Sequence, residues 1–177
     1  MLRAAIIALA VAWAIPARAN PSRIAVAEDL ARKQTERPAL YVAIGSAVDL
    51  SAGGDAAARK HNADLVRAAF DAQLAATPQL TGVASEARRF HLDARQLDVS
   101  LVRLDVTTEH GTVVVTAELR VVTSDDRGKL LAVLASHACA QMPSRAFTPT
   151  RFEALRKQAV ADASEDIVGR LRAQLAR

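Results

Sequence analysis

Aromatic residues and cysteines are scarce in this sequence. Aromatic side chains make up 3 % of its 177 residues, and Cys139 is its one cysteine. One thiol cannot close an internal disulfide, which excludes a disulfide-stapled scaffold. Stacking platforms for nucleic acid need aromatic side chains beside clustered Arg and Lys, so nucleic acid is not an expected partner either. With 51 % hydrophobic and 24 % charged residues, the composition remains typical of one globular domain.

A short apolar run near the N-terminus predicts export. Arg3 supplies a positive charge, the 11 residues from Ala5 to Ile15 are apolar, and Ala17-Arg18-Ala19 fits an A-x-A cleavage site. At about 1.5 Å per residue, the run is too short to cross a hydrocarbon core about 30 Å thick. We expect a signal peptide over residues 1–19 that is cleaved before Asn20, and no transmembrane segment in the mature chain. The mature protein is therefore expected to be periplasmic or secreted.

The expected mature chain has a nearly balanced charge. Loss of Arg3 and Arg18 leaves 21 basic and 19 acidic side chains, so the high isoelectric point does not indicate a dense basic face. Cys139 lies far from the cleavage site, and no cysteine is available there for bacterial lipoprotein acylation. In an oxidising compartment this thiol could instead join two chains, so a dimer through Cys139 is one prediction.

The signals for secondary structure begin weakly and then become clear. In the segment 20–38, Arg23 to Ala27 fits a short edge strand and Glu28 to Glu36 tolerates a helix, so its structure stays open. Apolar residues then alternate between positions 39 and 50, which predicts a buried strand with Gly45 as a possible bulge. A helix is expected from Asp55 or Asn62 to Thr77, because apolar residues return there every three or four positions.

Residues 97–141 have the pattern of a three-stranded β-meander. The expected strands cover residues 97–107, 113–122 and 129–141, and the turns between them contain Gly111 and Gly128. Apolar positions in the first strand change parity after Leu101, which predicts a β-bulge near Leu101 and Val102 that keeps both sets, Val106 included, on the core side.

A helix of about 25 residues is expected at the end of the chain. Thr148 before Pro149 fits an N-cap, and Thr150 with Glu153 fits a capping box one step later. Residues 39–177 are thus predicted to form a single α+β domain. Its expected architecture is a two-layer sandwich, with two helices packed on one face of a mostly antiparallel sheet.

The sequence contains no convincing catalytic or metal-binding constellation. His137 and Cys139 are two apart on an expected strand and share a face, but no second pair of ligands accompanies them, since His61, His91 and His110 lie in separate contexts. Two residues at this spacing are also too far apart for a Cys–His nucleophile pair. We therefore predict no catalytic, cofactor or metal residues and no cofactor.

Three other short motifs have simpler structural interpretations. Gly53-Gly54 precedes a helix but lacks the lysine and hydroxyl residue of a phosphate loop, so a flexible connection is expected. Asp125-Asp126 fits an exposed hairpin turn better than a pair of acid–base carboxylates. Gly45-Ser46 lies in an expected strand and lacks the G-x-S-x-G pattern of a nucleophilic serine.

The order strand, helix, meander and long final helix, with Arg23-Ile-Ala-Val-Ala27 near its start, resembles small envelope modules of bacteria. These are the periplasmic domain of the curli-secretion channel, the N-terminal domain of the translocation protein TolB, the lipopolysaccharide-assembly lipoprotein and the lipoprotein activators of penicillin-binding proteins. The chain departs from the lipoproteins among them in lacking an acylated cysteine. The resemblance implies an adaptor that binds a protein partner in the cell envelope and does not catalyse a reaction.

The expected function is therefore that of an exported, non-catalytic accessory module of the cell envelope that acts through protein binding. The alternative is a periplasmic carrier or sensor of a small ligand, held between helices and sheet where the many alanines leave space.

Overall fold

The computed structural model of the protein describes residues 38–175. The expected signal peptide over residues 1–19 lies outside the described residues. So do the segments Arg23–Ala27 and Glu28–Glu36, and expectations for all three stay predictions.

The described chain contains five strands, three α-helices and one turn of 3-10 helix. In chain order the elements are β1 (Leu40–Asp49), α2 (Ala56–Ala75), β2 (Leu80–Thr81), α3 (Ala84–Phe90), β3 (Asp93–Glu109), β4 (Thr112–Asp125), β5 (Leu130–Pro143), η1 (Ser144–Ala146) and α4 (Pro149–Leu175).

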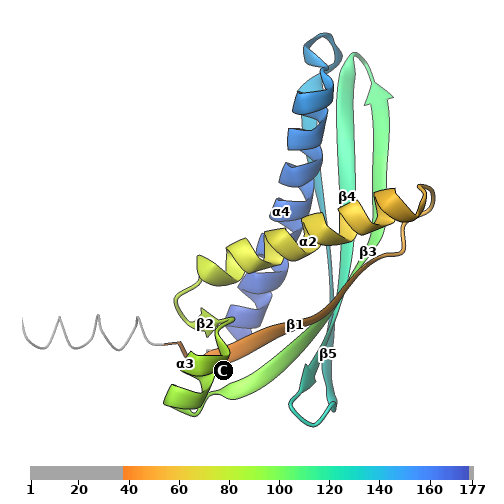
Figure 1. Ribbon diagram of the computed structural model, residues 1–177. Coiled ribbons are helices and arrows are strands. Elements are labelled where there is room, and N and C mark those ends of the chain that lie inside the picture. Colours follow the sequence, from red (N-terminus) through yellow and green to blue (C-terminus); the bar gives the residue numbers. More distant parts are fainter. Residues whose placement is uncertain (1–37, 176–177) are drawn as a thin grey trace, which may run out of the picture. The chain divides into compact units, whose positions relative to one another are not determined.

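The strands form one sheet in the order β2-β1-β3-β4-β5 (Figure 1). Strands β3, β4 and β5 pair antiparallel, which confirms the predicted meander. The sheet as a whole is mixed, because β1 runs parallel to both β2 and β3. Parallel neighbours need a crossover connection, and α2 supplies it between β1 and β2. The α+β class is confirmed, while the sheet has two more strands than the meander and is less purely antiparallel than expected.

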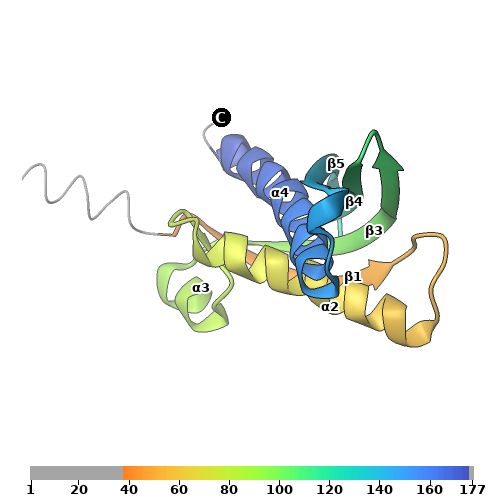
Figure 2. The ribbon, with the colours of Figure 1, turned by 90° about the horizontal axis from the view of Figure 1, so that it is seen from above.

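Helices α2 and α4 cover the same face of the sheet and pack against each other (Figure 2). The middle strand of the meander, β4, shows why this face is the core: its residues alternate between buried and partly exposed over most of its length. Side chains from the sheet and from both helices meet there, and those with no exposed surface include Val66, Phe70, Leu97, Leu119, Val121, Ala159, Ala163 and Ile167. The alternating residues Val113, Val115, Ala117, Leu119 and Val121 of β4 are all buried.

Both predicted bulges are present. The register between β1 and β3 shifts between Ile44 and Ser46, at Gly45. That between β3 and β4 shifts between Leu101 and Arg103. The second bulge keeps Leu104 packed against the core, but the expectation for Val106 is wrong, since 48 % of its surface is exposed. The pairing between β1 and β3 ends at Leu101. From there to Glu109, β3 has no neighbouring strand on the β1 side within the described residues.

The turns and helix ends follow from local chemistry. Gly111 and Gly128 both have positive φ angles, as the hairpin turns require. The hydroxyl of Thr148 accepts a hydrogen bond from the amide of Arg151 at 3.2 Å, which confirms the first of the two N-caps expected for α4. The carboxylate of Glu153, proposed for the other cap, points elsewhere and is described below.

Candidate functional site

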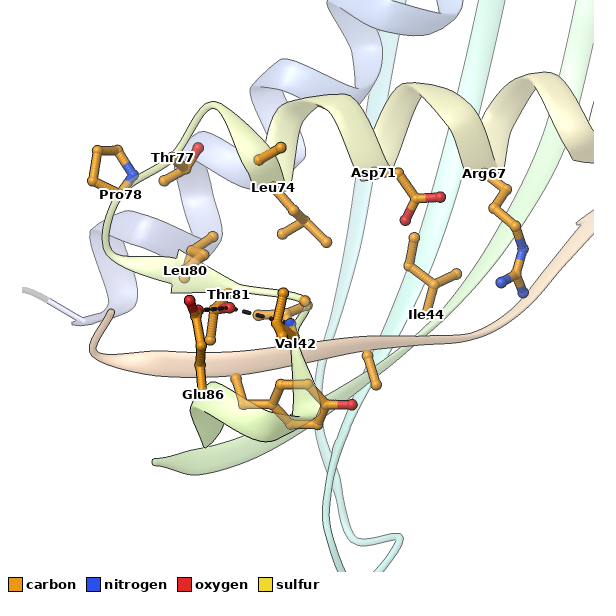
Figure 3. A pocket seen from close by; sticks show the side chains of 15 residues that line it. Val42, Ile44, Arg67, Asp71, Leu74, Thr77, Pro78, Leu80, Thr81 and Glu86 are labelled. Atoms are coloured by element: carbon orange, nitrogen blue, oxygen red, sulfur yellow. Dashed lines mark hydrogen bonds between the residues drawn. The ribbon is translucent and has the colours of Figure 1, made fainter. Parts of the chain in front are cut away.

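A cleft of about 590 Å³ lies between α2 and the outer edge of β1. Apolar side chains of β1, β2 and the end of α2 line its inner part, among them Val42, Ile44, Leu74 and Leu80 (Figure 3). Arg67 and Asp71 of α2 lie at the rim of the cleft, and Figure 3 shows both side chains directed toward β1. The cleft therefore combines an apolar lining with charges of both signs at its mouth.

A local hydrogen-bond pair shapes the end of this cleft beside β2. The hydroxyl of Thr81 donates to a carboxylate oxygen of Glu86 at 2.6 Å and accepts from the amide of Val83 at 3.1 Å. These contacts turn the chain from β2 into α3 (Figure 3). As a result β2 is only two residues long, and Val83 lies at the rim with 51 % of its surface exposed.

The early end of β2 leaves most of β1 with a free edge. Strand β2 pairs only with Leu40 and Tyr41, so from Val42 to Asp49 no strand within the described residues adjoins β1 on that side. The amide of Leu40 faces β2, since it donates to the carbonyl of Gln79 at 3.2 Å. Backbone groups of a strand alternate in direction, so those of Val42 and Ile44 also face the cleft.

A polar network lies between α2 and α4, toward the N-terminal end of α2 and away from the cleft. Asn62, with only 8 % of its surface exposed, donates to Asp49 at 2.7 Å and accepts a hydrogen bond from Arg156. Arg156 also donates to Glu153 at 2.9 Å, and Glu153 lies 3.0 Å from the Nε2 atom of His61. The network joins β1, α2 and α4, because each of these elements contributes at least one member.

Because of this network, the free energy of unfolding is expected to decrease at acid pH. The hydrogen bond with His61, and then the charge of Arg156, hold the pKa of Glu153 below its ordinary value. A lowered folded-state pKa contributes stability that is complete above the unfolded value of about 4.3 and is lost as the pH falls through the lower folded value. We expect the melting temperature of Glu153→Gln to fall less than that of the unchanged protein between pH 6 and pH 3, measured by circular dichroism. An equal decrease in melting temperature for the two proteins would show that the charged form of Glu153 does not stabilise the folded state.

The pair of residues considered for metal binding lies away from the cleft. His137 and Cys139 are both exposed on β5, on the face of the sheet opposite the helices. The Sγ atom of Cys139 lies 3.3 Å from the hydroxyl oxygen of Thr116. His137 borders a shallow hollow of about 340 Å³ with Arg103 and Glu118. Within residues 38–175 no three potential ligands come together as a metal site.

The remaining motifs have local structural roles. Asp125 accepts hydrogen bonds from the amides of Lys129 and Arg127 at 2.8 and 2.9 Å, which fix the turn and lower the pKa of its carboxyl. Ser46 donates to Asp98 at 2.7 Å across two strands. Gly53, in the loop before α2, has a positive φ of 102°. Of the other histidines, His61 joins the polar network, while His91 and His110 occupy left-handed positions at a helix end and in a turn.

Sequence reasoning missed the polar network and the cleft. One signal for the network was available, because Asn62 falls four residues before Val66 on the buried stripe of α2. A polar residue at such a position needs hydrogen-bond partners. Its partners Asp49 and Arg156 are far away in the sequence, and nothing in their local surroundings identifies them.

The arrangement of helices and sheet is one that other proteins share. The chain has the fold of a bacterial lipoprotein of known structure. A minor lipoprotein from Acinetobacter baumannii is 13 % identical, with a TM-score of 0.51 over 77 % of this chain and 94 % of that one. A DUF330 protein from Xanthomonas campestris is 15 % identical, with a TM-score of 0.49 over 78 % of this chain and 91 % of that one. No family model and no curated protein matches the sequence.

These similarities concern the fold alone. The similarity to the lipoprotein from Acinetobacter baumannii agrees with the predicted resemblance to small bacterial envelope modules at that level, while the four modules named from the sequence stay predictions. None of the helices in the described part of the chain is long and apolar enough to span a membrane.

Proposed function

We propose that this protein is an exported, non-catalytic accessory module of the cell envelope that acts by binding another protein. The observation that carries the proposal is the free edge of β1 at the floor of an apolar cleft. The shared fold with a bacterial lipoprotein supports an envelope setting, and the N-terminal pattern over residues 1–19 supports export.

A strand edge beside an apolar groove suits one kind of partner. An extended peptide can add to the edge through main-chain hydrogen bonds, and alternate side chains then enter the groove. Here the outward backbone groups of Ile44 supply the edge beyond the end of β2, and Leu74 and Leu80 line the groove above it. Arg67 and Asp71 at the rim would select the charges that flank the bound segment.

A small ligand is the second candidate, and the volume of the cleft favours it. About 590 Å³ falls within the range of roughly 300–1,000 Å³ that is typical of small-molecule pockets. A ligand bound only by the folded state raises the melting temperature. In a thermal-shift screen of envelope metabolites, this candidate requires a rise that Asp71→Ala abolishes.

Site-specific photocrosslinking tests the leading proposal. A photoreactive amino acid is placed at Val83 on the rim of the cleft, and at the exposed turn residue Arg127 as a control. After irradiation of intact cells, we expect one protein partner to be attached at Val83 and not at Arg127. The same partner at both positions, or none at Val83 in a folded and exported variant, would contradict binding in the cleft.

A further inference from the structure

Strand β5 is the outer strand at the other end of the sheet. It pairs with β4 along one side over residues 130–143, and it ends the strand order of the described chain. An exposed strand edge of this length invites pairing with another chain unless side chains or proline block it.

Two features block this edge, and they leave a defined window between them. A guanidinium nitrogen of Arg170 in α4 donates to the carbonyl of Ala135 at 3.1 Å, which occupies an outward backbone group. Pro143 ends the strand and has no N–H to donate. The stretch between these two features runs from Ser136 to Met142, and Cys139 is its central residue.

The charge pattern of this window differs from that of the part of β3 that β1 leaves uncovered. The seven residues read SHACAQM and contain no Asp, Glu, Lys or Arg. In contrast, the far part of β3, which β1 does not cover, carries Arg103, Asp105 and Glu109. Charged side chains are a usual means of keeping an edge strand unpaired. That protection is present on β3 and missing between Ser136 and Met142.

From these observations we infer that two copies of this chain pair antiparallel through residues 136–142 of β5. Cys139 is the central residue of the window. If the two-fold axis passes beside Cys139, all seven residues of one copy pair with the same seven residues of the other. This arrangement places His137 opposite Gln141 of the partner subunit and Ala138 opposite Ala140 of the partner subunit. Because the window contains no Asp, Glu, Lys or Arg, no like-charge repulsion opposes the pairing of two copies.

The proposed register has a geometric consequence at Cys139. The carbonyl of Ala135 faces outward, so the backbone groups of His137, Cys139 and Gln141 do as well. Directly opposed residues of this type have α-carbons about 5.5 Å apart, which is within the range of about 4.4–6.8 Å that a disulfide spans. A disulfide between the two Cys139 residues would therefore report the pairing. The pairing itself is formed by backbone hydrogen bonds along the strand edge and does not need the disulfide.

The first test measures the mass of the mature protein by light scattering after size exclusion, under reducing conditions. The expected result is a mass twice that of the monomer. Cys139→Lys places two positive charges at the axis and is expected to return the mass to that of a monomer. Val106→Lys, at an exposed position on β3, is the matched control and should remain dimeric. A monomeric unchanged protein, or a dimer that Cys139→Lys leaves intact, would overturn the inference.

The second test determines the register by crosslinking. Two variants, His137→Cys and Gln141→Cys, are made in a Cys139→Ser background, mixed, and treated with a copper–phenanthroline oxidant that accepts the electrons of the two thiols. We expect a disulfide in the mixture and in the unchanged protein, and little in either variant alone, since equivalent copies of position 137 are then about four residues apart along the strand. Efficient crosslinking of either variant alone, or none in the mixture, would contradict the register.

Discussion

Leu119→Asp is expected to prevent folding. Leu119 lies in the interior strand β4 with no exposed surface, beneath helix α4. Removal of a buried leucine side chain costs about 2–5 kcal/mol, and an unpaired carboxylate at the same place adds a further desolvation cost. Together these approach the whole free energy of unfolding of a domain, about 5–15 kcal/mol. Circular dichroism and one-dimensional proton NMR should show an unfolded chain.

Arg120→Asp is the matched control for this change. Arg120 is the next residue of β4 and is exposed on the opposite face of the sheet. We expect its midpoint in urea to change little, because neighbouring side chains of a strand point to opposite faces. If both variants were folded, or both unfolded, the assignment of the two faces of β4 would be wrong.

Asn62→Leu is expected to lower the free energy of unfolding by about 2–4 kcal/mol. The substitution retains the approximate size of the side chain but removes the donor to Asp49 and the acceptor for Arg156. A hydrogen bond to a charged group contributes about 1.5–3 kcal/mol, and the partners left behind are partly buried. Urea unfolding measured by circular dichroism gives the change.

Asp64→Leu serves as the control on the same helix. Asp64 is exposed on α2, and surface substitutions of this kind usually change stability by less than about 0.5 kcal/mol. A loss for Asn62→Leu no larger than for Asp64→Leu would mean that the network between β1, α2 and α4 is not a source of stability.

The periodic parts of the fold could be predicted from the sequence. In β4, every second residue from Val113 to Val121 is buried, and the alternation in the sequence arises from this one-sided burial. The change of parity at Leu101 is explained by one extra residue in the strand, and the structure has a bulge at this position. The long helices were equally legible, because one face of each packs on the sheet and repeats every three or four residues.

The remaining features depend on contacts that a local pattern does not contain. Helix α3 has no buried residue, so no apolar periodicity indicates it. The parallel pairing of β1 depends on where two distant strands meet. The cleft exists because β2 ends after Thr81, whose hydroxyl binds Glu86 and turns the chain away. No predicted catalytic or metal site led to the cleft, since its main feature is an unpaired backbone edge and not a set of reactive side chains.

Amide exchange along β1 tests the proposed binding edge most directly. An isotope-labelled chain without residues 1–19 is followed by NMR, alone and in an unlabelled envelope extract. Alone, the outward amide of Ile44 should exchange far faster than that of its neighbour Ala43, which faces β3. In the extract, an added strand should slow Ile44 at least tenfold and leave Ala43 unchanged. An Ile44 amide that is already protected in the isolated protein, or that exchanges equally fast in both samples, would contradict the account.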